Sequence, residues 1–126
     1  MNLQVPSSIT DGGPLHYMLG IEFNLESPEN GIHLCQRKFT EDILNKYNMA
    51  ELKPSPIPAI PNLSLSCDMA PQDPHEIEYT KNQQYREMLG SLRYLISCTR
   101  PDLCYITRYL SRFMQNPGKA HFDALV

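Results

Sequence analysis

Side chains that could perform catalysis are present in this chain of 126 residues, but not in the arrangements that enzymes use. A two-metal site for nucleotidyl transfer needs closely grouped carboxylates, and the sequence has no Asp-Asp or Asp-x-Asp pair. Glu41 and Asp42 are adjacent, but neighbouring residues diverge on a helix, so we interpret them as part of a solvated face. The sequence also lacks the Gly-x-Ser-x-Gly elbow and the glycine-rich phosphate loops. It therefore predicts that this chain alone is not an enzyme and binds no cofactor.

Cysteine and histidine could instead bind a metal. The four cysteines are Cys35, Cys67, Cys98 and Cys104, and the four histidines are His16, His33, His75 and His121. No Cys-x-x-Cys spacing and no paired histidines occur near them, so a zinc site is only weakly suggested. We expect no metal site and interpret the cysteines as buried free thiols.

Arginine and tyrosine in the last third of the chain form a pattern suited to binding. Arginines seven residues apart, and then four apart, fall on shared helix faces, and two tyrosines are interleaved with the second pair. Arginine binds phosphate in a bidentate manner, and aromatic rings stack on bases. The candidate nucleic-acid-binding residues are Arg86, Arg93, Arg108, Arg112, Tyr105 and Tyr109. The alternative is that they form the ordinary solvated face of a helical bundle.

The distribution of charge agrees with a binding role. Residues 1–80 hold four Lys and Arg against eleven Asp and Glu, whereas residues 81–126 hold seven against three. A basic segment behind an acidic one indicates nucleic acid or an acidic partner. No apolar run approaches the roughly 20 residues of a membrane span, and the N-terminus lacks the features of a signal peptide. We therefore expect no membrane partner and an intracellular location, cytoplasmic or nuclear.

The elements that would position these residues can be predicted from periodicity. Apolar residues alternate from Tyr17 to Leu25 and continue at Ile32 and Leu34, which predicts two strands joined by a turn at Pro28 and Asn30-Gly31. Two strands alone are not stable in water, so this hairpin needs a partner.

Helical spacing and proline content divide the rest of the chain. We expect a helix over residues 36–48, an extended Pro-rich connector, a helix over 85–96, another starting at Thr99-Arg100-Pro101-Asp102 with Thr99 as N-cap, and a last helix from residue 119. Gly90 inside a helix would be justified by close approach of a neighbouring element. The predicted fold is α+β, with segments 1–48, 49–80 and 81–126.

Two stretches in this order carry a family resemblance. "GPLHYMLGIEF" with "GIHLCQRKFTEDILNKYNM", then "YREMLGSLRYLISCTRPDLCYITRYLSRFMQNPGKAHFDAL", resemble the C-terminal part of the reverse transcriptase of Ty1/copia-type retrotransposons. The resemblance covers about residues 11–126. It implies a primer-grip hairpin over Tyr17–Cys35, in which Leu19 and Gly20 approach the primer terminus, followed by thumb-like helices that hold the template-primer.

The same resemblance implies what lies outside the chain. The family's paired catalytic aspartates sit on a palm hairpin upstream of the matching region, so Mg²⁺ is expected only in the complete polymerase. The expected partners are the template-primer nucleic acid and the missing fingers, palm and ribonuclease H domains, and the hairpin would lie against the palm sheet. Two alternatives are left open, a co-opted nucleic-acid-binding module and a non-functional transposon relic.

Overall fold

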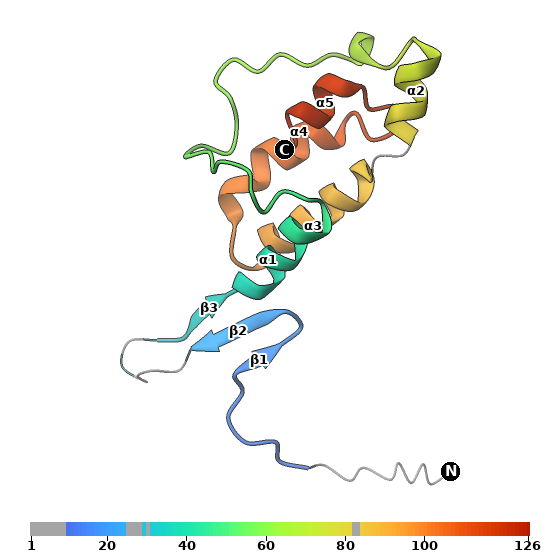
Figure 1. The fold of residues 1–126 in the computed structure, drawn as a ribbon. Coiled ribbons are helices and arrows are strands. Elements are labelled where there is room, and N and C mark those ends of the chain that lie inside the picture. The colour runs from blue at the N-terminus through green and yellow to red at the C-terminus, as the bar shows by residue number, and fades with distance from the viewer. Residues whose placement is uncertain (1–9, 25–28, 30, 82–83) are drawn as a thin grey trace, which may run out of the picture.

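A computed structural model describes residues 10–24, 29, 31–81 and 84–126, and it confirms the α+β class. Within these residues the chain forms a small sheet, one helix beside it, and a helical unit at the other end of the molecule (Figure 1). The elements are β1 (Tyr17–Met18), β2 (Ile21–Asn24), β3 (His33–Cys35), α1 (Arg37–Lys46), the 3-10 helix η1 (Cys67–Met69), α2 (Pro74–Lys81), α3 (Tyr85–Cys98), the 3-10 helix η2 (Pro101–Leu103), α4 (Cys104–Ser111) and α5 (Lys119–Asp123).

The sheet has three antiparallel strands in the order β1-β2-β3, and this corrects the predicted hairpin. The single strand expected from Tyr17 to Leu25 is wrong, because the chain reverses at Leu19 and Gly20, where φ is +53° and +78°. Met18 therefore pairs with Ile21 across a two-residue turn, as two positive φ angles allow in a hairpin. The predicted second pairing is confirmed, with Phe23 opposite Leu34. Leu25 and the predicted turn residues Pro28 and Asn30 lie outside the described residues.

Helix α1 begins and ends close to where periodicity placed it. The sheet supplies a hydrogen-bond acceptor for a free N–H group in its first turn: the Glu22 carboxylate accepts the N–H of Lys38 at 3.1 Å. At the other end Asn48 adopts φ +56°, and the N–H of Met49 donates to the carbonyl of Leu44 at 2.7 Å. This Schellman arrangement confirms Asn48 as the terminator.

The Pro-rich connector is less extended than its composition suggests. Residues 53–66 contain no helix or strand, but Ala59, Leu63 and Leu65 pack against the helical core. The connector then forms η1 and the helix α2, which the sequence analysis did not predict. Segment 49–80 thus includes η1 and most of α2 in addition to the predicted Pro-rich stretch.

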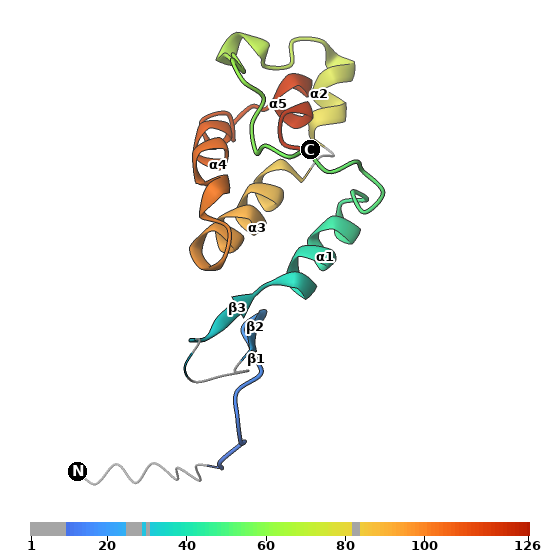
Figure 2. The same cartoon turned by 90° about the vertical axis from the view of Figure 1, so that its left-hand side faces the viewer.

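The helical core lies between α3, α4 and α5, and Figure 2 shows α4 and α5 beside α3 at the end away from the sheet. Its buried cluster consists of Tyr85, Leu89, Ile106, Leu110 and Phe122. His121 on α5 is fully buried and links the start of α5 to the connector. Its Nδ1 accepts the N–H of Gly118 at 2.8 Å, so Nε2 is left to donate to the carbonyl of Ser66 at 3.2 Å.

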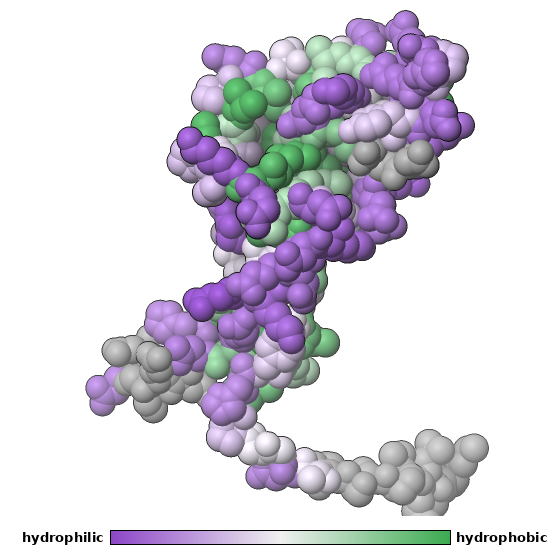
Figure 3. All heavy atoms as spheres, in the orientation of Figure 1, coloured by the Kyte–Doolittle hydropathy of each residue, from purple (hydrophilic) through white to green (hydrophobic). Residues whose placement is uncertain are grey.

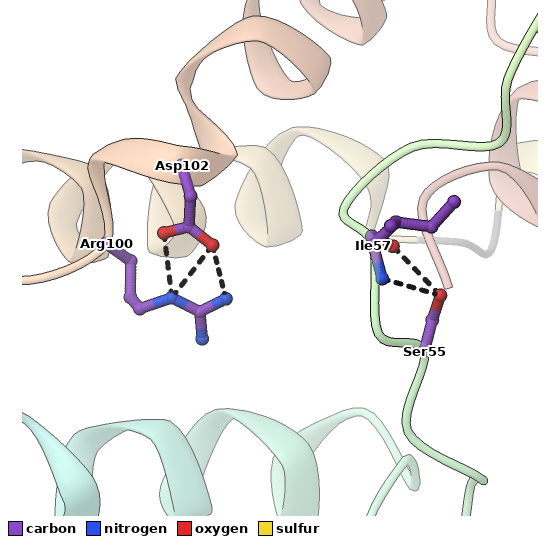
Figure 4. A network of polar contacts seen from close by, with 4 residues as sticks. All are labelled: Ser55, Ile57, Arg100 and Asp102. Carbon is purple, nitrogen blue, oxygen red and sulfur yellow. Dashed lines mark hydrogen bonds and ion pairs between the residues drawn. The ribbon is translucent and has the colours of Figure 1, made fainter.

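Two expectations about the helical part are wrong. Thr99 does not cap the next helix, because its hydroxyl donates to the Oε1 of Gln36 at 2.7 Å, and Asp102 instead binds Arg100 (Figure 4). Gly90 does not mark a close approach, since a Cβ there would meet nothing within 4 Å. In the same view the hydroxyl of Ser55 bonds with the backbone of Ile57, which closes a tight turn of the connector.

Contacts with α3 hold the sheet and α1 in place. Phe39 of α1 packs edge-on against Tyr94 of α3 at 4.9 Å, and the Tyr94 hydroxyl donates to the carbonyl of Leu19. Gln36, which precedes α1, is 3% exposed and accepts the bond from Thr99. The tip of the β1–β2 turn is thus fixed to the same helix that carries Arg86 and Arg93.

Apolar side chains of the sheet remain uncovered by the described residues. The exposed ones are Leu15, Tyr17, Met18, Leu19, Ile32 and Leu34. Figure 3 shows that α1, in contrast, presents a hydrophilic surface on its outer side. An uncovered apolar sheet agrees with the expectation that the hairpin was built to lie against another element.

The cysteines differ from their predicted state. Cys67 and Cys104 are exposed, and Cys35 and Cys98 are only partly buried, so none of the four is a buried thiol. Cys35 does belong to the sheet, opposite Glu22. In the described ranges no three metal-ligating side chains come together. Among the described helices, none has the length and apolar character needed to cross a bilayer.

Candidate nucleic-acid interface

A hollow between α3 and α4 brings two of the predicted arginines together. Arg93 and Arg108 both line it, and its volume is about 360 Å³. The remaining walls are Ile96, Ser97, Cys104, Thr107 and Ser111. Residues 93 and 97 are one helical turn apart on α3, as are 104, 108 and 111 on α4, so the hollow is a groove between facing sides of two helices.

Arg93 and Arg108 differ from Arg100 in having no carboxylate partner among the described residues. The Arg100 guanidinium donates to both carboxylate oxygens of Asp102, from Nε at 2.9 Å and from Nη2 at 2.8 Å. These bonds lower the pKa of the Asp102 carboxyl and raise the pKa of Arg100. Within residues 10–24, 29, 31–81 and 84–126, neither Arg93 nor Arg108 forms an ion pair. Their charges are therefore available to an anion.

The other two predicted arginines extend this basic surface. Arg86 lies two turns before Arg93 on the same face of α3, and its Nε donates to the carbonyl of Met114 at 3.3 Å. Arg112 is exposed one turn beyond Arg108, with its guanidinium carbon 5.9 Å from the centre of the Tyr109 ring. The predicted arginines thus lie along one α3–α4 pair, with Arg93 and Arg108 across one groove.

The two predicted tyrosines have different environments. Tyr105 is 74% exposed and stacks parallel to Tyr109, with ring centres 6.3 Å apart. Tyr109 is half-buried, and its hydroxyl accepts the N–H of Leu65 at 2.9 Å and donates to the Leu65 carbonyl at 3.2 Å. Tyr109 therefore ties the connector to α4, while the outer face of Tyr105 is free to stack on another ring.

The predicted primer-grip residues form the tip of the β1–β2 turn. Leu19 is 75% exposed. Its φ is positive, which is unusual for a residue with a branched side chain, and strained backbone often occurs at functional sites. At Gly20 the positive φ favours glycine, whereas space does not demand it, because a Cβ would only reach ordinary contact with Phe39 and Tyr94 at 3.7 Å. Binding by either residue stays a prediction.

Sequence reasoning missed the polar residues between the arginines. Thr107 is 2% exposed, and its hydroxyl oxygen has no hydrogen-bond partner among the described residues. Ser97 and Ser111 each donate to the carbonyl four residues earlier, at 2.8 Å and 2.7 Å. Their spacing of one turn from an arginine was visible in the sequence, but the pairing of α3 with α4 was not.

Comparisons with known proteins agree with a transposon origin. The chain is 36% identical, over 91% of its length, to the retrovirus-related Pol polyprotein from transposon TNT 1-94 of Nicotiana tabacum. It is 40% identical, over 98% of its length, to that from transposon RE1 of Arabidopsis thaliana. The chain spans only 9% and 8% of these two polyproteins.

A third relative is much shorter. The chain is 37% identical to an uncharacterized mitochondrial protein of Arabidopsis thaliana, and the match covers 94% of the chain and 45% of that protein. The chain matches no protein-family model and no solved structure. Its homologues thus include retrovirus-related Pol polyproteins from plant transposons, which supports an origin in such a polyprotein.

Proposed function

We propose that the chain is the gripping segment of an RNA-directed DNA polymerase in a Ty1/copia-type retrotransposon Pol polyprotein. It holds the template-primer and does not catalyse nucleotide addition on its own. The observation that carries the proposal is the pair of unneutralised arginines across the α3–α4 groove, in a chain that aligns almost end to end with transposon Pol polyproteins. Phosphate contacts of this kind position a duplex without reading its sequence.

The sheet supports the second part of the proposal, a partner outside the chain. Its exposed apolar residues, including Leu19, Ile32 and Leu34, would be covered by the palm of the complete polymerase. The Tyr94 hydroxyl links the Leu19–Gly20 turn to α3, which also lines the arginine groove, so the turn and the groove would approach the same template-primer together.

The salt dependence of binding tests this function. The full chain is titrated against a fluorescent primer-template duplex at several salt concentrations. If Arg86, Arg93, Arg108 and Arg112 together neutralise three or four phosphates, the slope of log K against log salt should be roughly −2 to −4, since each phosphate contributes about 0.7 to 0.9. The double variant Arg108→Gln with Arg112→Gln should lower the slope by about a third to a half.

Arg100→Gln is the matched control, because it removes the same charge from an arginine that Asp102 already neutralises. It should leave the slope unchanged. A slope that falls equally in Arg100→Gln would mean that the salt dependence reports only the net charge of the protein. If the folded chain does not bind the duplex at low salt, the chain alone does not grip a template-primer.

The mitochondrial relative favours a second candidate, a transposon relic or a binding module used outside a polyprotein. Sequencing the genomic DNA upstream of residue 1 separates these possibilities. A continuous reading frame encoding a palm with paired aspartates supports the polymerase segment. A promoter without such a frame supports a separate module, and stop codons support a relic.

A further inference from the structure

We propose that the hollow between α3 and α4 is a single-phosphate site, in which the guanidinium groups of Arg93 and Arg108 bind one phosphate group from two helices. The inference deepens the proposed function and rests on it, because it names the group bound and the residues that bind it. A volume of about 360 Å³ leaves room for a phosphate and some of its water, since one water occupies about 30 Å³.

The charges around the hollow favour an anion. Its lining contains two arginines and no Asp or Glu. Other hollows with a cation also include an acid: Lys46 is accompanied by Asp123, Arg86 by Glu87, and Lys119 by several carboxylates. Cations in those hollows are therefore partly neutralised by neighbouring carboxylates, whereas two like charges across an α-helical groove attract a shared counter-charge.

One of the three hydroxyl groups around the hollow, that of Thr107, supports the same ligand. Ser97 and Ser111 already donate to helix carbonyls, so they add little to anion binding. Thr107 lies one residue before Arg108, is 2% exposed, and its hydroxyl has no partner among the described residues. A buried polar group without a partner is unfavourable. The Thr107 oxygen is closed to solvent in this structure, so we assign the hydroxyl as a third donor that reaches a phosphate oxygen when the Thr107 side chain rotates.

The test measures each arginine separately. Nε–H signals of the full chain are followed by NMR while inorganic phosphate or dimethyl phosphate is added at constant ionic strength. The signals of Arg93 and Arg108 should shift with saturation and share one dissociation constant, while those of Arg86 and Arg112 should not saturate. Saturation with dimethyl phosphate identifies an internal phosphodiester as the natural ligand, whereas saturation with inorganic phosphate alone identifies a terminal phosphate.

Variants establish which groups bind. Arg108→Gln should weaken phosphate binding at Arg93 at least tenfold, as expected for loss of a charge-assisted bond, while Arg100→Gln, at an arginine that Asp102 neutralises, should leave it unchanged. Thr107→Val should weaken it severalfold, and Thr107→Ser should restore it. Circular dichroism confirms that each variant is folded.

The proposal is overturned if both ligands shift all four arginine signals equally and without saturation, or if Arg108→Gln and Arg100→Gln have the same effect. An unchanged affinity in Thr107→Val removes the hydroxyl from the site. If phosphate saturates the Arg93 and Arg108 signals but the chain binds no primer-template, the phosphate site is supported and the proposed function is contradicted. If the primer-template binds with an unchanged salt slope in Arg93→Gln, template-primer binding is supported and the phosphate site is contradicted.

Discussion

Single residues of the same type have different roles in this structure. Arg100 is neutralised by Asp102 two residues away, whereas Arg108 faces a groove without carboxylates. Tyr109 bonds to the backbone of Leu65, which is 44 residues earlier, whereas Tyr105 is exposed. The sequence identified these residue types and their spacing correctly. It could not separate the roles, because Tyr109 bonds to a segment 44 residues earlier and because the groove that Arg93 lines forms only when α3 packs beside α4.

The hydroxyl of Tyr109 should contribute to stability, and that of Tyr105 should not. Tyr109→Phe leaves the N–H and carbonyl of Leu65 without their partner, so the free energy of unfolding should fall by about 1–3 kcal/mol. Tyr105→Phe, at an exposed position, should change it by less than about 0.5 kcal/mol. Urea denaturation measures both. Equal effects would show that the connector is not held through Tyr109.

Tyr85 should make stability depend on alkaline pH. Burial raises the pKa of Tyr85 to about 12 from an ordinary 10.0, and its hydroxyl donates to the Leu110 carbonyl at 3.0 Å. Since the unfolded chain loses this proton first, the contribution is fully present below about pH 10 and is lost as the pH rises towards 12. The stability difference between wild type and Tyr85→Phe should therefore shrink over this range. A constant difference in urea denaturation from pH 9 to 12 would argue against the shift.

At the scale of elements, periodicity predicted α1, α3 and α4 but not α2. Each of the three predicted helices carries apolar residues at helical spacing, although only α3 and α4 bury residues fully. Helix α2 was missed because the prolines around it dominated the interpretation. A signal was nevertheless present, since Asp73 precedes Pro74 and its carboxylate accepts the N–H of His75 at 3.3 Å, a common helix start.

The β1–β2 turn had no comparable signal. The alternation of apolar residues from Tyr17 to Phe23 favours one continuous strand, whereas the observed register puts Tyr17 on the face of Glu22 and Met18 on the face of Ile21. A leucine with positive φ at position 19 is contrary to local preference, and it is held by the bond from Tyr94 in a distant helix. Tertiary contacts therefore determine this turn, which sequence reasoning alone could not establish.

The two glycines of the helical part should respond in opposite directions to alanine. At Gly118, which precedes α5, a Cβ would lie 1.9 Å from the backbone oxygen of Met69, so Gly118→Ala should destabilise the protein by about 1–3 kcal/mol. Gly90 is exposed within α3 and a Cβ there meets nothing, so Gly90→Ala should stabilise it by about 0.5–1 kcal/mol. Thermal or urea unfolding of both variants measures the contrast. Equal destabilisation would contradict the predicted packing of η1 against Gly118.

At the scale of the whole molecule, a helical core and an uncovered sheet share one chain. The core is buried between α3, α4, α5 and the connector, whereas apolar residues of the sheet remain exposed. The sequence predicted this imbalance, because a hairpin of this size needs a covering partner. It could not predict that Tyr94 and Thr99 would fix the sheet and α1 to α3. This attachment would present the turn and the arginines together to one ligand.

The central claim, that the chain supplies the grip but not the catalysis of a polymerase, is tested most directly by reconstitution. The part of the RE1 Pol polyprotein that precedes its similarity to this chain is prepared alone, with this chain, and with its own corresponding segment as the positive control. Template-dependent primer extension is measured with Mg²⁺. We predict no extension by either part alone, extension when the chain is added, and a marked loss with Arg93→Gln and Arg108→Gln together. Extension by this chain alone, or none from the mixture while the positive control extends, would contradict the account.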